Sequence, residues 1–229
     1  MNYTQFQAYQ DRFVRALKAV LSERGKDAEV SEAAFPAYAD SNSLIRFLFW
    51  RRLWVTVNFL ESHGPYEAML DFGCGSGVAL PLLAGFGNRV VGVDINLAPY
   101  RALSAHFSFG NEVEVYEAKE HPLSSFPDNT FDVIISLDVL EHVDDLRGVF
   151  AEFCRVTKSD GTVVVSGPTE NLFYRIGRMI AGTEYTGDYH VTNIYNIQKV
   201  MKTFMETKTL ATLYYPFPLF KIFVGRVAP

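Results

Sequence analysis

Acidic side chains stand at three points of this chain where a short apolar or β-branched run ends: Asp71, Asp94 and Glu117. A carboxylate in such a position can accept hydrogen bonds from the hydroxyl, ammonium or amino groups of a ligand. In an open parallel sheet, ligands bind outside the carboxyl ends of the strands, near the topological switch point. The pattern therefore predicts that the three acids line one ligand site. The alternative is that Asp71 and Asp94 are only turn or cap residues.

A glycine-rich loop follows the first acid, in the run Asp71-Phe72-Gly73-Cys74-Gly75-Ser76-Gly77. Glycine adopts positive φ readily and lets the backbone approach a ligand, so a side chain at Gly73 or Gly75 would occupy the ligand's space. The spacing is G-x-G-x-G, whereas a loop that grips a pyrophosphate reads G-x-G-x-x-G. Asp71 would repel a pyrophosphate but would suit an ammonium group, directly or through water. The loop therefore disfavours a dinucleotide.

The other two acids suit a nucleoside. Asp94 follows Gly73 at about the 20-residue offset expected of an acid that binds ribose hydroxyls. Glu117 ends the next strand, where a carboxylate can accept a hydrogen bond from an adenine amino group. The three acids and the loop together predict a ligand with an ammonium group, a ribose and an adenine.

These residues resemble the donor site of class I S-adenosylmethionine-dependent methyltransferases of the type 11-like group. Two further runs are similar to the small-molecule branch that includes quinone-biosynthesis methyltransferases: Phe126-Pro127-Asp128-Asn129-Thr130-Phe131-Asp132-Val133-Ile134 and Asp138-Val139-Leu140-Glu141-His142-Val143. The resemblance covers about Glu67 to Ser166. It implies S-adenosylmethionine as cofactor, held by Asp71, Gly73, Gly75, Gly77, Asp94, Ile95, Glu117, Ala118 and Leu137. The family does not fix the acceptor, or whether an oxygen, nitrogen or carbon is methylated.

Strands and helices alternate from residue 68 onward. We expect strands at 68–72, 89–94, 112–117, 131–137 and 161–166, with helices at 76–86, 97–107 and 145–157. This alternation predicts an α/β, Rossmann-like, mostly parallel sheet with helices on both faces. A helix at 194–206 and two strands at 209–215 and 219–227, paired like a hairpin around Pro216 and Pro218, complete seven strands.

Two helices are expected before this domain, over 4–24 and from Ser41 or Ser43 to about 62. The predicted organisation is a helical cap at 1–64 and a methyltransferase domain at 65–229, with an acceptor-site insertion at about 167–195. We expect the cap to cover the carboxyl ends of the strands as a lid, because a lid excludes water from the reaction.

Methyl transfer needs positioning more than a dedicated nucleophile, although an oxygen acceptor usually needs a general base. The candidate catalytic residues are His142, His190 and Tyr189. Structural roles remain open alternatives: His142 can anchor its loop, and His190 can lie on a surface loop. Asp138, Glu141 and His142 resemble the E-x-x-E-H pattern of some metal-dependent relatives, but the shorter aspartate reduces the reach, and we predict no metal.

The composition restricts the partners. The net charge is −5 without a long basic run, so no nucleic-acid partner is expected. The 44–60 stretch mixes aromatic residues with Arg46, Arg51 and Arg52; it is too short and too charged to span a bilayer but suits a peripheral membrane contact. The alternative is a helix packed on the domain. Two distant cysteines and no signal-peptide core predict a cytoplasmic protein. The oligomeric state is left open.

The expected function is methyl transfer from S-adenosylmethionine to a small acceptor, which the aromatic-rich segments suggest is apolar or lipid-like. One alternative is a non-catalytic partner protein that binds the cofactor. Another is a dinucleotide-dependent oxidoreductase, against which the glycine spacing and Asp71 argue.

Overall fold

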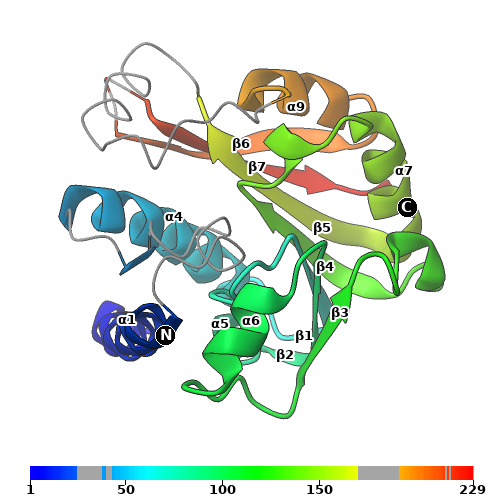
Figure 1. The fold of residues 1–229 in the computed structure, drawn as a ribbon. Helices are drawn as coiled ribbons and strands as arrows, with labels where there is room; N and C mark the ends of the chain where they lie inside the picture. Colours follow the sequence, from blue (N-terminus) through cyan, green and yellow to red (C-terminus); the bar gives the residue numbers. More distant parts are fainter. Residues whose placement is uncertain (25–37, 40–42, 170–190, 215, 217, 229) are drawn as a thin grey trace. The chain divides into compact units, whose positions relative to one another are not determined.

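The computed structural model describes residues 1–24, 38–39, 43–169, 191–214, 216 and 218–228. Within this part of the chain, seven strands form one sheet in the order β3-β2-β1-β4-β5-β7-β6 (Figure 1). Their bounds are β1 Tyr66–Phe72, β2 Gly87–Asp94, β3 Val113–Glu117, β4 Phe131–Leu137, β5 Thr157–Pro168, β6 Glu206–Leu213 and β7 Phe220–Arg226. The predicted Rossmann-like α/β sheet is confirmed.

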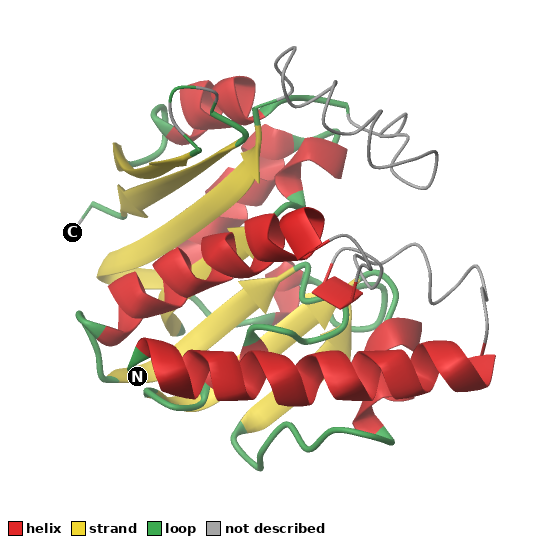
Figure 2. Cartoon of the chain, turned by 90° about the vertical axis from the view of Figure 1, so that its left-hand side faces the viewer, coloured by secondary structure: helices red, strands yellow, loops and turns green. Residues whose placement is uncertain are grey.

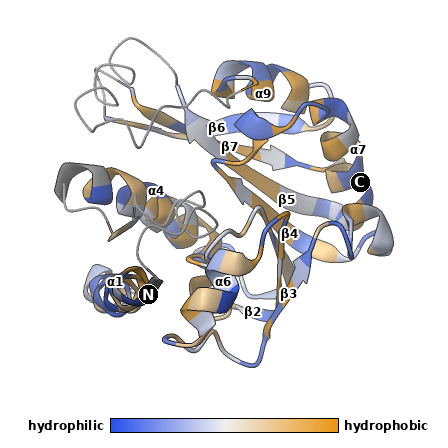
Figure 3. Ribbon diagram, in the orientation of Figure 1, coloured by the Kyte–Doolittle hydropathy of each residue, from blue (hydrophilic) through white to orange (hydrophobic). Residues whose placement is uncertain are grey.

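Most of the sheet is parallel. The pairs β1–β4, β2–β3 and β4–β5 are parallel, whereas β7 pairs antiparallel with both β5 and β6. The middle of β4 and the second half of β5 are buried, and Figure 3 shows hydrophobic colour along both strands. Continuous burial is expected of parallel strands that are covered on both faces. The antiparallel β6–β7 pair confirms the predicted hairpin-like ending.

Helices connect and precede these strands. The α-helices are α1 Tyr3–Arg24, α4 Ser43–Glu61, α5 Leu80–Leu83, α6 Ala98–Ser104, α7 Leu146–Val156 and α9 Ile194–Met201, and the 3₁₀ turns are η1 Leu123–Ser125 and η2 Leu140–His142. Asp145 caps α7, since its Oδ1 accepts a 2.8 Å hydrogen bond from the amide of Gly148. Such a side chain satisfies an amide that the first helical turn leaves without a partner.

Several predicted elements differ in extent from the observed ones, including the following three. The helix expected over 76–86 is wrong in length, because Gly77 has φ +80°, which excludes it from a right-handed helix, and α5 is confined to Leu80–Leu83. The strand expected at 161–166 is longer at both ends. The helix expected over 194–206 ends at Met201, since β6 already begins at Glu206.

The contacts of the chain group into two compact units. The first unit comprises residues 1–66 and 73–121, and the second unit comprises 67–72 and 122–229. In the first unit, α1 and α4 lie alongside each other (Figure 2) and share an aromatic core in which the rings of Phe6, Tyr9 and Phe13 pack edge-on against Trp50. The expected division at residue 64, and the role of the helices as a lid, stay predictions.

The second unit is fastened at the start of its parallel strands. Asp132 accepts hydrogen bonds from the amides of Glu67 and Ala68 and from the ammonium of Lys158, each at 2.8 Å. Burial by itself would raise the pKa of Asp132, but these hydrogen bonds lower it overall. Among the described helices, none combines the length and apolarity needed to cross a bilayer.

Candidate donor site

The glycine loop of the first unit is tied to the end of β2 by its backbone. The amides of Gly73 and Cys74 donate to the carbonyl of Val93 at 2.7 and 3.2 Å. Gly73, Gly75 and Gly77 have φ values of +81°, +53° and +80°, a region that side chains with a Cβ rarely adopt. The three glycines are therefore required by the turn itself, as their spacing indicates.

Gly75 and Gly77 face different surroundings. A Cβ built on Gly75 would have no heavy atom of the described residues within 4 Å, so this side of the loop is open among those residues. A Cβ on Gly77 would lie 2.7 Å from the Phe109 ring and 3.0 Å from the Tyr100 ring. Gly75 thus leaves room beside the backbone, whereas Gly77 allows close packing.

Asp94 joins the loop to the end of β2 through its carboxylate. Its Oδ2 accepts a 2.7 Å hydrogen bond from the amide of Gly75, and its Oδ1 accepts a 3.0 Å hydrogen bond from the amide of Asn96. Burial raises the pKa of Asp94, and these backbone hydrogen bonds reduce that shift without reversing it. The amide of Ile95 is a third backbone donor to this carboxylate, whose two oxygens offer about four lone-pair positions, so it can still accept a further hydrogen bond.

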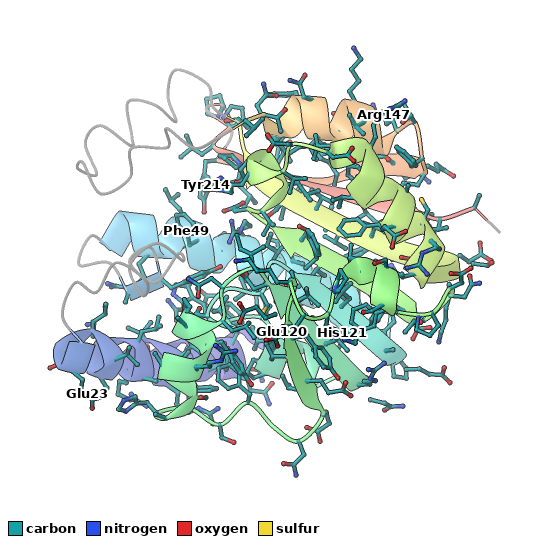
Figure 4. All side chains as sticks on the ribbon, turned by 45° about the vertical axis from the view of Figure 1, so that its right-hand side comes forward. Glu23, Phe49, Glu120, His121, Arg147 and Tyr214 are labelled. Carbon is teal, nitrogen blue, oxygen red and sulfur yellow. The ribbon has the colours of Figure 1, made fainter. Side chains whose placement is uncertain are left out.

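The end of β3 lies beside Asp94. Asp94 and Glu117 are register partners, and the amide of Ala118 donates to the carbonyl of Asp94 at 2.7 Å. Glu117 forms an ion pair with Arg101 at 3.2 Å, and the side chain of Arg101 is 64% exposed. Figure 4 labels Glu120 and His121, which follow this strand. Ile95 is 74% exposed, which is unusual for a large apolar side chain.

These features fit the predicted cofactor. The open space at Gly75 leaves room for a ligand against the loop, the carboxylate of Asp94 keeps acceptor capacity, and Ile95 offers an exposed apolar surface. A ribose presents two hydroxyl donors, and an adenine presents a flat apolar face. The described residues of the first unit therefore fit the nucleoside part of S-adenosylmethionine.

The remaining predicted donor residues belong to the second unit. Asp71 lies near the end of β1 as the register partner of Ile135 and is only 3% exposed. Leu137 ends β4 and is half-buried. The next residue, Asp138, has φ +58°; its amide donates to the carbonyl of Ser166 at 3.0 Å, and Oγ of Ser166 donates to its Oδ1 at 3.3 Å.

The turn after β4 carries the predicted catalytic histidine. Glu141 is 1% exposed, and its carbonyl accepts hydrogen bonds from the amides of Val191 and Thr192 at 2.8 and 3.3 Å. His142 is exposed. The backbone of this turn therefore binds the residues that directly precede the N-cap of α9.

Two of the predicted catalytic residues, His190 and Tyr189, lie outside the described residues. The aromatic and basic residues at 174–189, which belong to the expected insertion, do so as well. Among the residues that the structure describes, no group of three histidine, cysteine or acidic side chains is arranged to hold a metal ion.

Sequence reasoning missed one residue that contacts the loop. Tyr9 of α1 is buried, and its hydroxyl donates a 2.7 Å hydrogen bond to the carbonyl of Val78, directly after Gly77. Burial raises the pKa of Tyr9 well above its ordinary value, so the hydroxyl remains a donor at neutral pH. The helical spacing of Tyr9 indicated only a buried face.

Comparison with known proteins addresses the same part of the chain. Residues 70–165 match the family model of a methyltransferase domain. Over this region the chain is therefore similar to methyltransferases. The ubiquinone biosynthesis O-methyltransferase of Mesorhizobium japonicum is 31% identical over 123 residues, which are 53% of this chain and 49% of that protein. The phosphoethanolamine N-methyltransferase of Triticum aestivum is 33% identical over 104 residues, which are 44% of this chain and 20% of that protein.

Solved structures of other proteins are similar to this chain in their fold. The N-methyltransferase NodS of Bradyrhizobium japonicum, in complex with S-adenosyl-L-homocysteine, aligns with a TM-score of 0.62 at 15% identity, covering 93% of this chain and 99% of that chain. The PH0226 protein of Pyrococcus horikoshii aligns with a TM-score of 0.62 at 22% identity, covering 84% and 95%. The chain spans about half the length of the first curated relatives it matches.

Proposed function

We propose that the protein transfers the methyl group of S-adenosylmethionine to a small, apolar or lipid-like acceptor. One observation carries this proposal: Gly75 has open space beside it among the described residues, and its amide donates a hydrogen bond to the carboxylate of Asp94. The names of relatives that act in ubiquinone biosynthesis support a small acceptor with apolar character.

The donor residues would divide the work by chemical type. Asp94 would accept hydrogen bonds from the ribose hydroxyls, and Glu117 would accept one from the adenine amino group. Asp71 would attract the ammonium group. Gly73, Gly75, Ile95, Ala118 and Leu137 would provide backbone and apolar surface around the ligand, and Gly77 would keep the loop closely packed. When bound, S-adenosylmethionine supplies a methyl group that its sulfonium already activates.

The chain's remaining task is to orient the acceptor and to remove its proton. His142, with His190 and Tyr189, would serve as the base or as contacts to the acceptor. An imidazole nitrogen can take the proton that an acceptor hydroxyl or amine loses as the methyl group is transferred. Holding the acceptor in line with the methyl group would supply most of the rate enhancement.

A turnover assay tests this function. The purified protein would be incubated with S-adenosylmethionine and a panel of phenolic, amine and lipid acceptors, and S-adenosylhomocysteine would be quantified. We expect its release to depend on one acceptor class. Binding of S-adenosylhomocysteine with no release from any class would favour the non-catalytic partner, and binding of NADH instead would favour the oxidoreductase.

We further propose that α4 makes a peripheral contact with a membrane surface. Phe47 on α4 and Tyr3 on α1 are 49% and 47% exposed. They border a cavity of about 230 Å³, and none of its described lining residues is acidic: Tyr3, Phe6, Gln7, Gln10, Arg46, Phe47, Trp50, Arg51 and Trp54. Exposed aromatic residues beside arginines suit an anionic lipid surface.

Vesicle co-sedimentation tests this contact. We expect the protein to sediment with phosphatidylglycerol vesicles but not with phosphatidylcholine vesicles, and Arg51→Glu to abolish sedimentation. Lys18→Glu makes the same charge change at an exposed position of α1 that does not line the cavity, and should have little effect. Equal sedimentation of the two variants would refute a contact through α4.

We also propose that the protein works in the reduced cytoplasm. Neither Cys74 nor Cys154 forms a disulfide, and Cys74 is buried in the donor loop. Cell fractionation with an antibody against the protein tests this location, and recovery from an oxidising compartment would contradict it.

A further inference from the structure

The carbonyl of Val78 has an unusual hydrogen-bonding problem. Val78 precedes Ala79, the N-cap residue of α5, and is 8% exposed, so its carbonyl needs a partner within the protein. A donor three residues on is missing, because residue 81 is proline and has no amide hydrogen. The amide four residues on, Leu82, donates instead to Ala79 at 3.0 Å. The helix therefore supplies no donor to this carbonyl.

Tyr9 supplies the missing donor from a distant part of the sequence. Its hydroxyl donates a 2.7 Å hydrogen bond to the carbonyl oxygen of Val78. The Tyr9 ring packs against Phe13 of α1 and Trp50 of α4, with ring centroids 5.7 and 6.1 Å away. A fixed ring holds the hydroxyl in one place, so the bond anchors the loop to the N-terminal helices.

The same helix supports the loop by a second route, through packed rings. Phe13 contacts Phe107 at 5.2 Å, Phe107 contacts Phe109 at 5.4 Å, and Phe109 contacts Tyr100 at 4.5 Å, all between ring centroids. Phe109 and Tyr100 are the rings that a Cβ on Gly77 would touch. At the other end of α1, the carboxylate of Glu23 (labelled in Figure 4) lies 3.0 Å from Nε2 of His106, the residue directly before Phe107.

These contacts bear on ligand binding because they hold the chain directly after the glycine loop. Only Ser76 and Gly77 separate Val78 from Gly75, whose amide donates to the Asp94 carboxylate. Glycines lose more conformational freedom on ordering than other residues do, so an unanchored loop would have to lose that freedom when a ligand binds. An anchor at Val78 removes part of this cost in advance.

We propose that Tyr9 is a positioning residue for the donor site, whose hydroxyl holds the glycine loop in the conformation that binds S-adenosylmethionine. The inference rests on the proposed donor binding. It assigns to α1 a function on the donor side that a lid over the acceptor does not require. Tyr9 touches no ligand in this account and acts only through Val78.

Calorimetric titration with S-adenosylhomocysteine tests the proposal. Tyr9→Phe keeps the packed ring and removes only the hydroxyl, and the dissociation constant should rise about tenfold. Tyr66→Phe is the matched control: the Tyr66 hydroxyl also donates to a backbone carbonyl, that of Leu60 at 3.0 Å, at the opposite end of β1 from the loop. Both variants should lower the unfolding temperature, but only Tyr9→Phe should weaken binding.

A compensating change makes the test specific. Pro81→Ala restores an amide three residues after Val78, and in the Tyr9→Phe background it should recover most of the lost affinity. Full affinity in Tyr9→Phe, or a loss that Pro81→Ala leaves unchanged, would overturn the proposal. Absence of binding by the unsubstituted protein would instead contradict the proposed function, so the two failures are distinguishable.

Discussion

The glycine loop of the first unit and the turn after β4 in the second unit carry two different parts of the predicted chemistry, and they are built differently. The loop is held by short backbone hydrogen bonds to residues of β2, such as those to Val93 and Asp94, and one side of it is open. At the turn after β4, Glu141 is buried, and its carbonyl accepts hydrogen bonds from the amides of Val191 and Thr192, which directly precede the capping residue of α9.

This difference suggests how the two parts are specified. A donor common to many methyltransferases needs the same few backbone positions, which a short sequence motif can encode. An acceptor differs from one enzyme to the next, so the residues around it come from a segment with no fixed pattern. We therefore expect substitutions in the loop to act on donor binding, and substitutions at the turn to act on turnover.

The largest effect should come from the turn. His142→Gln removes the proposed base, and methyl transfer should fall about 100-fold while S-adenosylhomocysteine binding stays unchanged. His63→Gln, at an exposed histidine of the first unit, is the control. If His142→Gln instead lowers the unfolding temperature and leaves turnover intact, His142 only anchors its loop.

Two glycines of one loop sharpen the comparison next. Gly75→Ala places a methyl group in the open space, so affinity for S-adenosylhomocysteine should fall about tenfold, with about 1 kcal/mol of strain from its positive φ. Gly77→Ala meets the Phe109 ring and should lower stability more, by about 1–3 kcal/mol. Thermal unfolding measures the loss of stability in each variant, and calorimetry measures the loss of affinity. If the ratio of lost affinity to lost stability is the same in both variants, Gly75 and Gly77 do not have distinct roles.

A smaller effect should appear with pH. Burial raises the pKa of Asp94 in the free protein, and donated ribose hydroxyls would favour the ionised form, so binding should lower that pKa. Affinity is then constant above the raised pKa and falls as pH decreases through it, by at most about tenfold per pH unit. Titrations across the acid range should show this decline for the intact protein, and a flat profile would mean that Asp94 does not meet the ligand.

Much of the fold follows from local patterns in the sequence. The β-branched runs at 89–94 and 131–137 and the helical spacing of Phe6, Tyr9 and Phe13 predicted their elements within a few residues. The region 76–86 misled because its apolar spacing is helical, whereas the positive φ of Gly77 delays the start of the helix to Leu80. Periodicity carries no information about backbone handedness at a glycine.

The site was predictable where one segment defines it. Asp94 and the glycines are recognisable because the loop and the strand end have fixed spacings. Tyr9 was not, since 69 residues separate it from Val78 and its spacing marks only a buried helix face. A hydrogen bond between distant segments depends on tertiary packing, which no local pattern encodes.

The central claim is that the first unit binds the donor through Asp94, and one titration tests it most directly. Purified protein would be titrated with S-adenosylhomocysteine in parallel with Asp94→Ala and with Glu112→Ala, which changes an exposed acid elsewhere on this unit. We predict micromolar binding by the intact protein and by Glu112→Ala, and at least about 100-fold weaker binding by Asp94→Ala, because two hydrogen bonds to a charged group are lost. Equal binding by Asp94→Ala, or no binding by the intact protein together with binding of NADH, would contradict the account.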